Sequence, residues 1–245
     1  TGTFMTETGD YRFLEGSLSG DTLRLSTFDG GFLVYFQALM EKDSLTQGRY
    51  YSGRSSVTPW RGFRDSTFTL RDPDKLTYLK EGYEGIEFSL PDLEGDTLSL
   101  EDPSLKDKAV IVQIMGSWCP NCIDETRYLK KVYRKYREKG LEIVGLTFER
   151  GRTRKAGLKR ALKMKRDLEI PYPVLLAGAT RDDAAEEVLP MLNHVMSFPT
   201  TLFLNRQHEV VHIHTGFAGP GTPVYEDFVT EKNALIQRLI NSNNS

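Results

Sequence analysis

Cys119 and Cys122 stand three positions apart in the segment GSWCPNCIDE, and they are the only cysteines among the 245 residues. Such a pair could form a structural disulfide, supply half of a metal site or act as a redox couple. A structural disulfide over this spacing closes a very short loop and restrains little entropy of the unfolded chain. A zinc site needs two more ligands, and the nearest histidine, His194, follows Cys122 by 72 residues. The spacing therefore favours a redox couple.

The flanking segments predict where the cysteines lie. Residues 109–115 (AVIVQIM) form an apolar, β-branched run with Gln113 as its one polar member, which is typical of a strand buried on both faces. Residues 123–138 carry apolar side chains at helical spacing, and Gly140 is a suitable stop. Cys119 is therefore expected at a strand-to-helix turn, at or near the N-terminus of the helix.

This placement would give the two sulfur atoms different chemistry. Free backbone N–H groups and the positive end of the helix dipole would face the Cys119 sulfur. Such surroundings lower the pKa of a thiol and make a thiolate available near neutral pH. Pro120 suits the first helical position, which needs no N–H. Cys122, one turn further along, is expected to be less exposed and to resolve a mixed disulfide.

Two further segments complete a resemblance to a known fold. The motif WCPNC after an apolar strand, followed roughly 75 residues later by SFPTTLFL (197–204), resembles the thioredoxin fold. In that fold the proline of the second motif is cis and lies against the Cys-x-x-Cys, and Pro199 matches it. The segment EVVHIHTGF (209–217) is similar to the antiparallel strand and glycine-containing turn that come next. The resemblance covers roughly residues 83–241.

Finer features resemble one subfamily. Residues 86–108 are similar to the extra N-terminal hairpin of the TlpA/ResA-like thiol–disulfide oxidoreductases and the related peroxiredoxins. Thioredoxins carry a buried Asp where this chain has Gln113, whereas ResA-like proteins carry a Glu six positions after the first cysteine, matched by Glu125. The resemblance implies that Glu125 relays a proton to or from Cys122. The alternative is a solvated glutamate in the first helical turn, favoured there by the dipole.

The resemblance also implies which residues meet the substrate. Pro199 would keep the backbone beside Cys119 available to pair with the substrate chain. Trp118 would shield the disulfide and line the substrate surface, where Pro120 and Phe198 are expected as well. The redox-active disulfide would be the only redox group, with no bound cofactor and no metal.

The expected fold class is α/β. A thioredoxin-like domain over residues 83–245 would have a central mixed sheet flanked by helices, the extra N-terminal hairpin, and a helical insert over residues 149–195. The remaining strands are predicted at 141–148, 173–176, 200–204 and 210–214, and the remaining helices at 156–168, from a cap at Asp182 through Leu192, and at 224–240.

Residues 1–82 differ in pattern and predict a small antiparallel all-β module. Polar and apolar residues alternate through this region, and glycine-containing turns at 19–21 and 29–31 separate the runs. The module could pack on the core, hold a partner or add an edge to a sheet, and the sequence leaves these three roles open.

Charge and hydropathy bear on other classes of function. The formal net charge of −2 predicts no polyanion partner, and no apolar run approaches the roughly 18–20 residues that span a bilayer. Residues 150–166 hold nine Lys or Arg and no acid, but the helical spacing of their apolar members indicates a solvated basic helix. His212 and His214 would share one face of a strand. Without a third ligand in view, they are expected to be solvent-exposed rather than metal-bound.

The sequence thus predicts a thiol–disulfide oxidoreductase that uses its Cys-Pro-Asn-Cys pair. The residues leave the direction of electron flow open, and the resemblance favours reduction of disulfides of exported proteins. Expected partners are disulfide-containing or thiol proteins of the cell envelope and an upstream electron donor, with no nucleic acid. The resemblance implies a periplasmic or envelope-associated location, and a lipid anchor could have preceded Thr1. Two alternatives stay open: a binding or adaptor protein on a thioredoxin scaffold, and a thiol peroxidase. The second lacks the Thr-x-x-Cys pattern of peroxiredoxins, because Gly116 lies three positions before Cys119.

Overall fold

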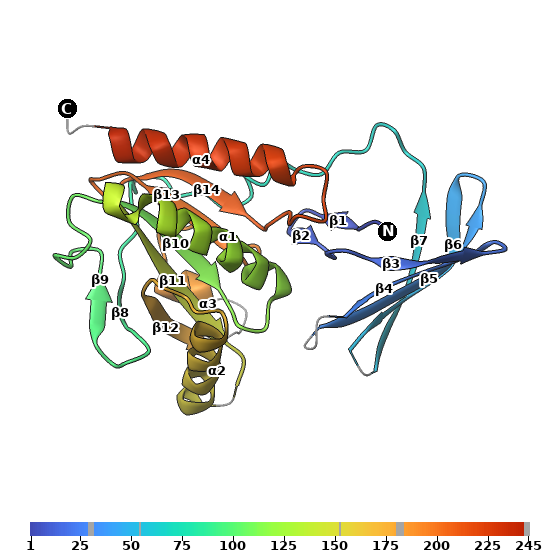
Figure 1. Cartoon of the computed structure of the whole chain (residues 1–245), viewed down its shortest axis with the longest axis horizontal. Coiled ribbons are helices and arrows are strands. Elements are labelled where there is room, and N and C mark those ends of the chain that lie inside the picture. The colour runs from blue at the N-terminus through green and yellow to red at the C-terminus, as the bar shows by residue number, and fades with distance from the viewer. Residues whose placement is uncertain (29–31, 54, 152, 180–183, 243–245) are drawn as a thin grey trace. The chain divides into compact units, whose positions relative to one another are not determined.

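The structure is a computed structural model that describes residues 1–28, 32–53, 55–151, 153–179 and 184–242. The chain divides into two compact units, each with a five-stranded sheet of its own (Figure 1). The smaller unit comprises Thr1–Thr6, Asp10–Leu70 and Gly219–Pro223, and the larger comprises Glu7–Gly9, Arg71–Ala218 and Val224–Ser245.

The smaller unit is an antiparallel meander in the strand order β3-β4-β5-β6-β7, which confirms the predicted all-β module. The alternating sequence explains it: along β5 (Leu33–Glu41), Val34, Phe36 and Ala38 are buried while the residues between them are more exposed. Of the two predicted turns, the first joins β3 to β4, and the second, at 29–31, lies outside the described residues. The other strands are β1 (Met5–Thr6), β2 (Gly9–Asp10), β3 (Glu15–Ser19), β4 (Thr22–Phe28), β6 (Ser44–Ser52) and β7 (Ser56–Phe63).

The larger unit is built on a mixed sheet in the order β12-β11-β10-β13-β14. Its central strand, β10 (Ala109–Met115), is buried at every position, as the apolar run predicts. β10 pairs in parallel with β11 and antiparallel with β13, and β13 forms the predicted antiparallel hairpin with β14. The expected extra hairpin is present as β8 paired with β9. Their bounds are β8 (Ser89–Pro91), β9 (Thr97–Ser99), β11 (Leu141–Glu149), β12 (Val174–Ala179), β13 (Thr200–Leu204) and β14 (Val210–Thr215).

Both faces of this sheet are covered. Ile111 and Met115 of β10 pack in one apolar cluster with side chains of α1, α2 and α4. Val110 and Val112, which point the other way, pack in a second cluster with α3 and the β8–β9 hairpin. The helices are α1 (Pro120–Tyr136), continued by the 3₁₀ turn η1 (Arg137–Lys139), then α2 (Arg154–Asp167), α3 (Ala184–Val188) and α4 (Tyr225–Asn241).

One predicted helix is shorter than expected. The predicted cap at Asp182 lies outside the described residues, and α3 ends at Val188 rather than continuing through Leu192. Pro190 explains the early end, since it has no N–H to donate and its ring disfavours helical backbone at the residue before it.

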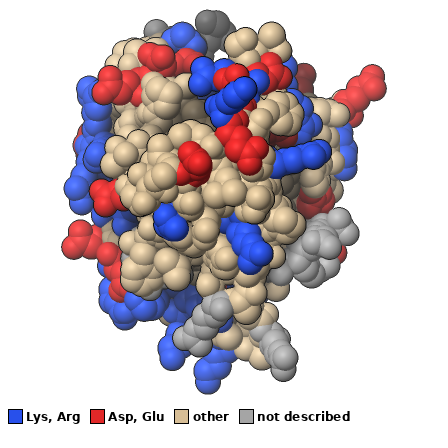
Figure 2. Space-filling model, turned by 90° about the vertical axis from the view of Figure 1, so that its right-hand side faces the viewer, with Lys and Arg blue, Asp and Glu red and all other residues tan. Residues whose placement is uncertain are grey.

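The basic side chains of α2 face solvent, as the sequence predicts. The lysines and arginines described on α2 are mostly exposed, which confirms a solvated basic helix, and Lys165 pairs with Glu94 at 3.0 Å. On the face drawn in Figure 2, acidic and basic side chains are scattered among uncharged ones. None of the helices described in the chain is long and apolar enough to cross a membrane.

Candidate active site around the Cys119–Cys122 disulfide

Cys119 is the N-cap of α1. Its backbone is extended (φ −99°, ψ 113°), and its Sγ accepts the backbone N–H of Cys122 over 3.2 Å. Pro120 occupies the start of the helix, where its missing N–H costs nothing. The two cysteines form a disulfide with their Cα atoms 5.3 Å apart. The predicted strand-to-helix turn is therefore confirmed, with an orphan helical N–H directed at the first sulfur.

The two cysteines differ in exposure in the predicted sense. Cys119 is 5% exposed and Cys122 is fully buried. Beside them the Phe198–Pro199 peptide bond is cis, as the resemblance implies, and the Phe198 carbonyl oxygen lies 3.3 Å from Cys119 Sγ. The second motif of the sequence therefore does lie against the first cysteine.

Glu125 is a buried carboxyl group, only 2% exposed, so the alternative of a solvated first-turn glutamate is wrong. Gln113 Nε2 donates to its Oε2 over 2.8 Å, and Thr201 Oγ1 donates to its Oε1, also over 2.8 Å. Burial raises the pKa of Glu125 to about 7, against the opposing effect of these two hydrogen bonds. A carboxyl group with this pKa can give up or accept a proton near neutral pH.

Gln113 and Thr201 bind the carboxyl group of Glu125, and neither is predicted as a site residue from the sequence. Gln113 Nε2 also lies 3.4 Å from the Cys122 carbonyl oxygen, and Thr126 Oγ1 donates to Gln113 Oε1 over 3.2 Å. The sequence does carry a signal for Gln113. It is the one polar residue of an otherwise apolar strand, so a buried side chain there must find buried hydrogen-bond partners. Thr201 carries no comparable signal within its own segment.

Trp118 and Phe198 lie together beside the disulfide. Their ring centroids are 5.5 Å apart, and both side chains are partly buried. Trp118 Nε1 donates to the Phe148 carbonyl oxygen over 2.9 Å, and the Arg150 guanidinium lies 4.2 Å from the centre of the indole. Pro120 is also partly buried. The residues predicted to line the substrate surface are thus grouped around Cys119.

The expectation that both histidines of β14 are solvent-exposed is wrong. His214 is 7% exposed, and its Nδ1 lies 2.6 Å from Asp74 Oδ1; His212 Nε2 lies 3.1 Å from the same oxygen. Lys232 of α4, 1% exposed, places its Nζ 2.7 Å from His212 Nε2 and 3.4 Å from Asp74 Oδ1. The physical reason for the difference is α4, because its Lys232 lies against these side chains.

Asp74, His212 and His214 bring ligand atoms within 4.8 Å of one another, the kind of donor set that transition metals take. The Lys232 ammonium already provides a positive charge in this space, so the cluster is an ion-pair network. Burial would raise the pKa of Asp74, but hydrogen bonds from His212 and His214 outweigh it and hold that pKa well below its usual range. Burial lowers the pKa of His214 despite its hydrogen bond with Asp74.

The group around Cys119 has the parts that thiol–disulfide exchange needs. It offers a sulfur capped by a helical N–H, a second buried sulfur within bonding distance, and a buried carboxyl group with a pKa of about 7. A disulfide can take up two electrons and release them again, so this pair can serve as an electron carrier.

Comparison with known proteins agrees with this chemistry. The AhpC/TSA family model matches residues 82–213, more than half of the chain. Thiol-disulfide oxidoreductase ResA of Bacillus cereus is 30% identical over 159 residues, which cover 65% of this chain and 78% of that protein. ResA of Halalkalibacterium halodurans is 26% identical over 153 residues, covering 61% and 76%.

A solved structure shares the fold. An uncharacterized conserved protein from Geobacillus kaustophilus superposes with a TM-score of 0.53 at 18% identity, covering 66% of this chain and 83% of that one. With the sheet order, the disulfide at the start of α1 and the cis proline beside it, the larger unit is thioredoxin-like. The chain belongs to the AhpC/TSA family and is a thiol–disulfide oxidoreductase of the ResA-like kind.

Proposed function

We propose that this oxidoreductase reduces disulfides of exported proteins and that Cys119 is the attacking sulfur. The observation that carries the proposal is the hydrogen bond from the Cys122 N–H to Cys119 Sγ, which would stabilise a thiolate at Cys119. Cys119 is also the more exposed of the two cysteines, at 5% against 0%. The first cysteine is therefore the better nucleophile and the easier one to reach.

The reaction would proceed in two exchange steps. The Cys119 thiolate attacks one sulfur of a partner disulfide, a new S–S bond forms, and the other partner sulfur leaves as a thiolate. The Cys122 thiolate then attacks Cys119 Sγ, which closes the chain's own disulfide and releases the second partner sulfur. Two electrons pass to the partner, and an upstream dithiol donor restores Cys119 and Cys122.

Glu125 would accept the proton of Cys122 in the second step. Its pKa of about 7 lets it hold a proton in one half of the cycle and release it in the other. Gln113 and Thr201 each bind one of its oxygens, so the carboxyl group keeps one orientation while it titrates.

The substrate chain would lie along the Phe198–Pro199 segment. Pro199 has no N–H, and the Phe198 carbonyl oxygen beside Cys119 is a backbone acceptor that an extended substrate could use. Trp118 and Phe198 would provide apolar contact around the exchanging sulfur atoms, with Pro120 at the helix start.

Insulin-disulfide reduction tests the proposal. Cys119→Ser should abolish turnover, whereas Cys122→Ser should stop turnover but accumulate a mixed disulfide that non-reducing gels resolve. The two variants serve as controls for each other, because each removes one sulfur from the same helix end. Undiminished turnover in Cys119→Ser would overturn the proposal, and peroxide consumption without any effect on insulin would favour the peroxidase alternative.

The same proposal places the protein in the cell envelope, with exported proteins that carry thiols or disulfides as its partners. Both cysteines of the chain are joined in one disulfide, so no further thiol is exposed to misoxidation in an oxidising compartment. Labelling of intact cells with a membrane-impermeant maleimide, after mild reduction, should modify Cys119. Labelling only after lysis would place the protein inside the cell. A measured redox potential for the pair then decides the direction of electron flow.

A further inference from the structure

Glu149, the last residue of β11, is a buried acid that the mechanism above does not use. It is 1% exposed. Its Oε1 accepts the backbone N–H of Ser117 over 2.9 Å and the hydroxyl of Thr147 over 2.7 Å, and its Oε2 accepts the hydroxyl of Ser117 over 2.6 Å. Two of these three hydrogen bonds come from a residue that stands two positions before Cys119.

Phe148 and Arg150, the residues on either side of Glu149, contact Trp118, which follows Ser117 in the same loop. The Phe148 carbonyl oxygen accepts Trp118 Nε1 over 2.9 Å, and the Arg150 guanidinium lies 4.2 Å from the centre of the Trp118 ring. The last two residues of β11, Phe148 and Glu149, and the residue after the strand, Arg150, therefore contact the two residues that precede Cys119.

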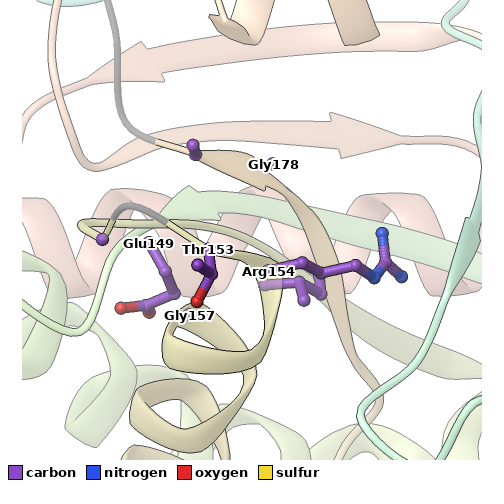
Figure 3. A pocket seen from close by; sticks show the side chains of 8 residues that line it. Glu149, Thr153, Arg154, Gly157 and Gly178 are labelled. Atoms are coloured by element: carbon purple, nitrogen blue, oxygen red, sulfur yellow. The ribbon is translucent and has the colours of Figure 1, made fainter.

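The carboxylate is directed to this loop rather than to the pocket beside it. A pocket of about 190 Å³ lies between the end of β11 and the start of α2, and Glu149 is one of the residues that line it. Figure 3 shows the carboxylate turned away from Gly178, with the guanidinium of Arg154 extending in the opposite direction. A Cβ at Gly157 would lie 3.1 Å from Glu149 Cβ, so this glycine lets α2 approach closely.

We propose that Glu149 is a positioning residue for the redox pair: by holding Ser117, it keeps Cys119 Sγ where the helical N–H of Cys122 can stabilise the thiolate. The proposal rests on Cys119 being the attacking sulfur in the function proposed above. The Ser117 N–H and hydroxyl are bound to one buried carboxylate, so both the backbone and the side chain of the loop are fixed. A loop free to shift would weaken the donor contact at Cys119, and misplacement of a reacting atom by about 1 Å can cost on the order of a hundredfold in rate.

The test compares two uncharged replacements of similar size, Glu149→Gln and Glu149→Leu, each combined with Cys122→Ser so that Cys119 is the single thiol. Glutamine keeps a carbonyl oxygen for the Ser117 N–H, and leucine keeps no acceptor. The charge is removed in both, so their difference reports the hydrogen bonds alone. Iodoacetamide alkylation across the pH range gives the pKa and the reactivity of Cys119. We expect the leucine variant to have the higher thiol pKa and to react about tenfold more slowly at neutral pH.

Glu142→Gln is the matched control, since Glu142 lies on the same strand and pairs with Lys108; it should react like the Cys122→Ser parent. Equal pKa values and rates for the glutamine and leucine variants, both folded by circular dichroism, would overturn the proposal. If the leucine variant does not fold, Ser117→Ala and Ser117→Thr replace the pair. Cys119 in the Ser117→Ala variant should then react about threefold more slowly than in Ser117→Thr. Equal rates would again contradict the proposal.

This readout is independent of any protein substrate. If the variants alkylate as expected but the protein with both cysteines leaves insulin untouched, the proposed function is contradicted and the role of Glu149 is not. Normal insulin turnover by the protein with both cysteines, together with identical alkylation of the glutamine and leucine variants, would contradict the role of Glu149 and not the proposed function.

Discussion

The side-chain amide of Gln113 donates a hydrogen bond of 2.8 Å to the carboxyl group of Glu125 and lies 3.4 Å from the carbonyl oxygen of Cys122. One amide on the central strand thus contacts both the titrating acid and the backbone of the second cysteine. Thr201, from the neighbouring strand, binds the other oxygen of Glu125. The acid is therefore buried between two strands and a helix.

Replacing Glu125 by Gln should change how stability depends on pH. The pKa of Glu125 is about 7 in the folded chain and near 4.5 in the unfolded one, so the folded state binds the proton more tightly. Its contribution to stability is therefore complete below about pH 4.5 and is lost as pH rises towards 7, by on the order of 3 kcal/mol. Urea unfolding of the oxidised protein measures this. The wild-type curve should fall relative to Glu125→Gln across that window, and parallel curves would contradict the assignment.

Gln113→Leu should raise the pKa of Glu125 beyond about 7, because it removes a hydrogen bond that favours the ionised form. The titration of the Glu125 carboxyl carbon, followed by NMR in the oxidised protein, gives the midpoint. Gln237→Leu is the control, since this amide donates to the Tyr136 hydroxyl over 3.1 Å, away from the carboxyl group. An unchanged midpoint in Gln113→Leu would show that the amide does not act on the acid.

Gly116→Ala should displace Trp118. A Cβ at this position would meet the indole Nε1 and would lie 2.8 Å from the Phe148 carbonyl oxygen, which accepts the indole N–H. In a Trp60→Phe background, Trp118 emission should move to longer wavelength, and insulin reduction should fall about tenfold. Gly2→Ala is the control, because nothing lies within 4 Å of its Cβ. Normal emission together with normal turnover would refute the prediction.

Lys232→Met should destabilise the fold by about 2 kcal/mol at neutral pH, because it leaves Asp74 without a buried cation while keeping the volume. The loss should shrink as pH falls and Asp74 becomes protonated, since the pKa of that group is held low only while its partners remain. Urea unfolding at neutral and acid pH measures both effects. Lys75→Met removes an exposed pair with Asp72 and should cost little. Equal losses of stability in Lys232→Met and Lys75→Met would show that the buried ammonium of Lys232 contributes no more than an exposed one.

The redox pair and its setting were predictable because their signals are local. The apolar run of seven residues predicts the buried strand, and the proline at the start of α1 predicts where the helix begins. The two cysteines, one helical turn apart, predict which of them is more exposed. The α/β fold and the cis Pro199 followed from the resemblance of two motifs.

The partners of these residues could not be predicted, because they meet through the sheet. Thr201 binds Glu125 across 76 positions of sequence, and Ser117 binds Glu149 across 32. Neither contact leaves a periodic pattern in the sequence from which it could be predicted. The burial of His214 also depends on an element distant in sequence, since the helix that carries Lys232 packs against its strand.

Because Cys119 caps α1, the end of this helix is coupled to the redox state of the pair. A thiolate is a stronger hydrogen-bond acceptor than a disulfide sulfur, so reduction should tighten the contact with the Cys122 N–H and slow hydrogen exchange at that amide. By thermodynamic linkage, whatever steadies this helix end makes the reduced chain easier to form and a weaker electron donor. We therefore expect changes in the first turn of α1 to shift the reduction potential of the pair.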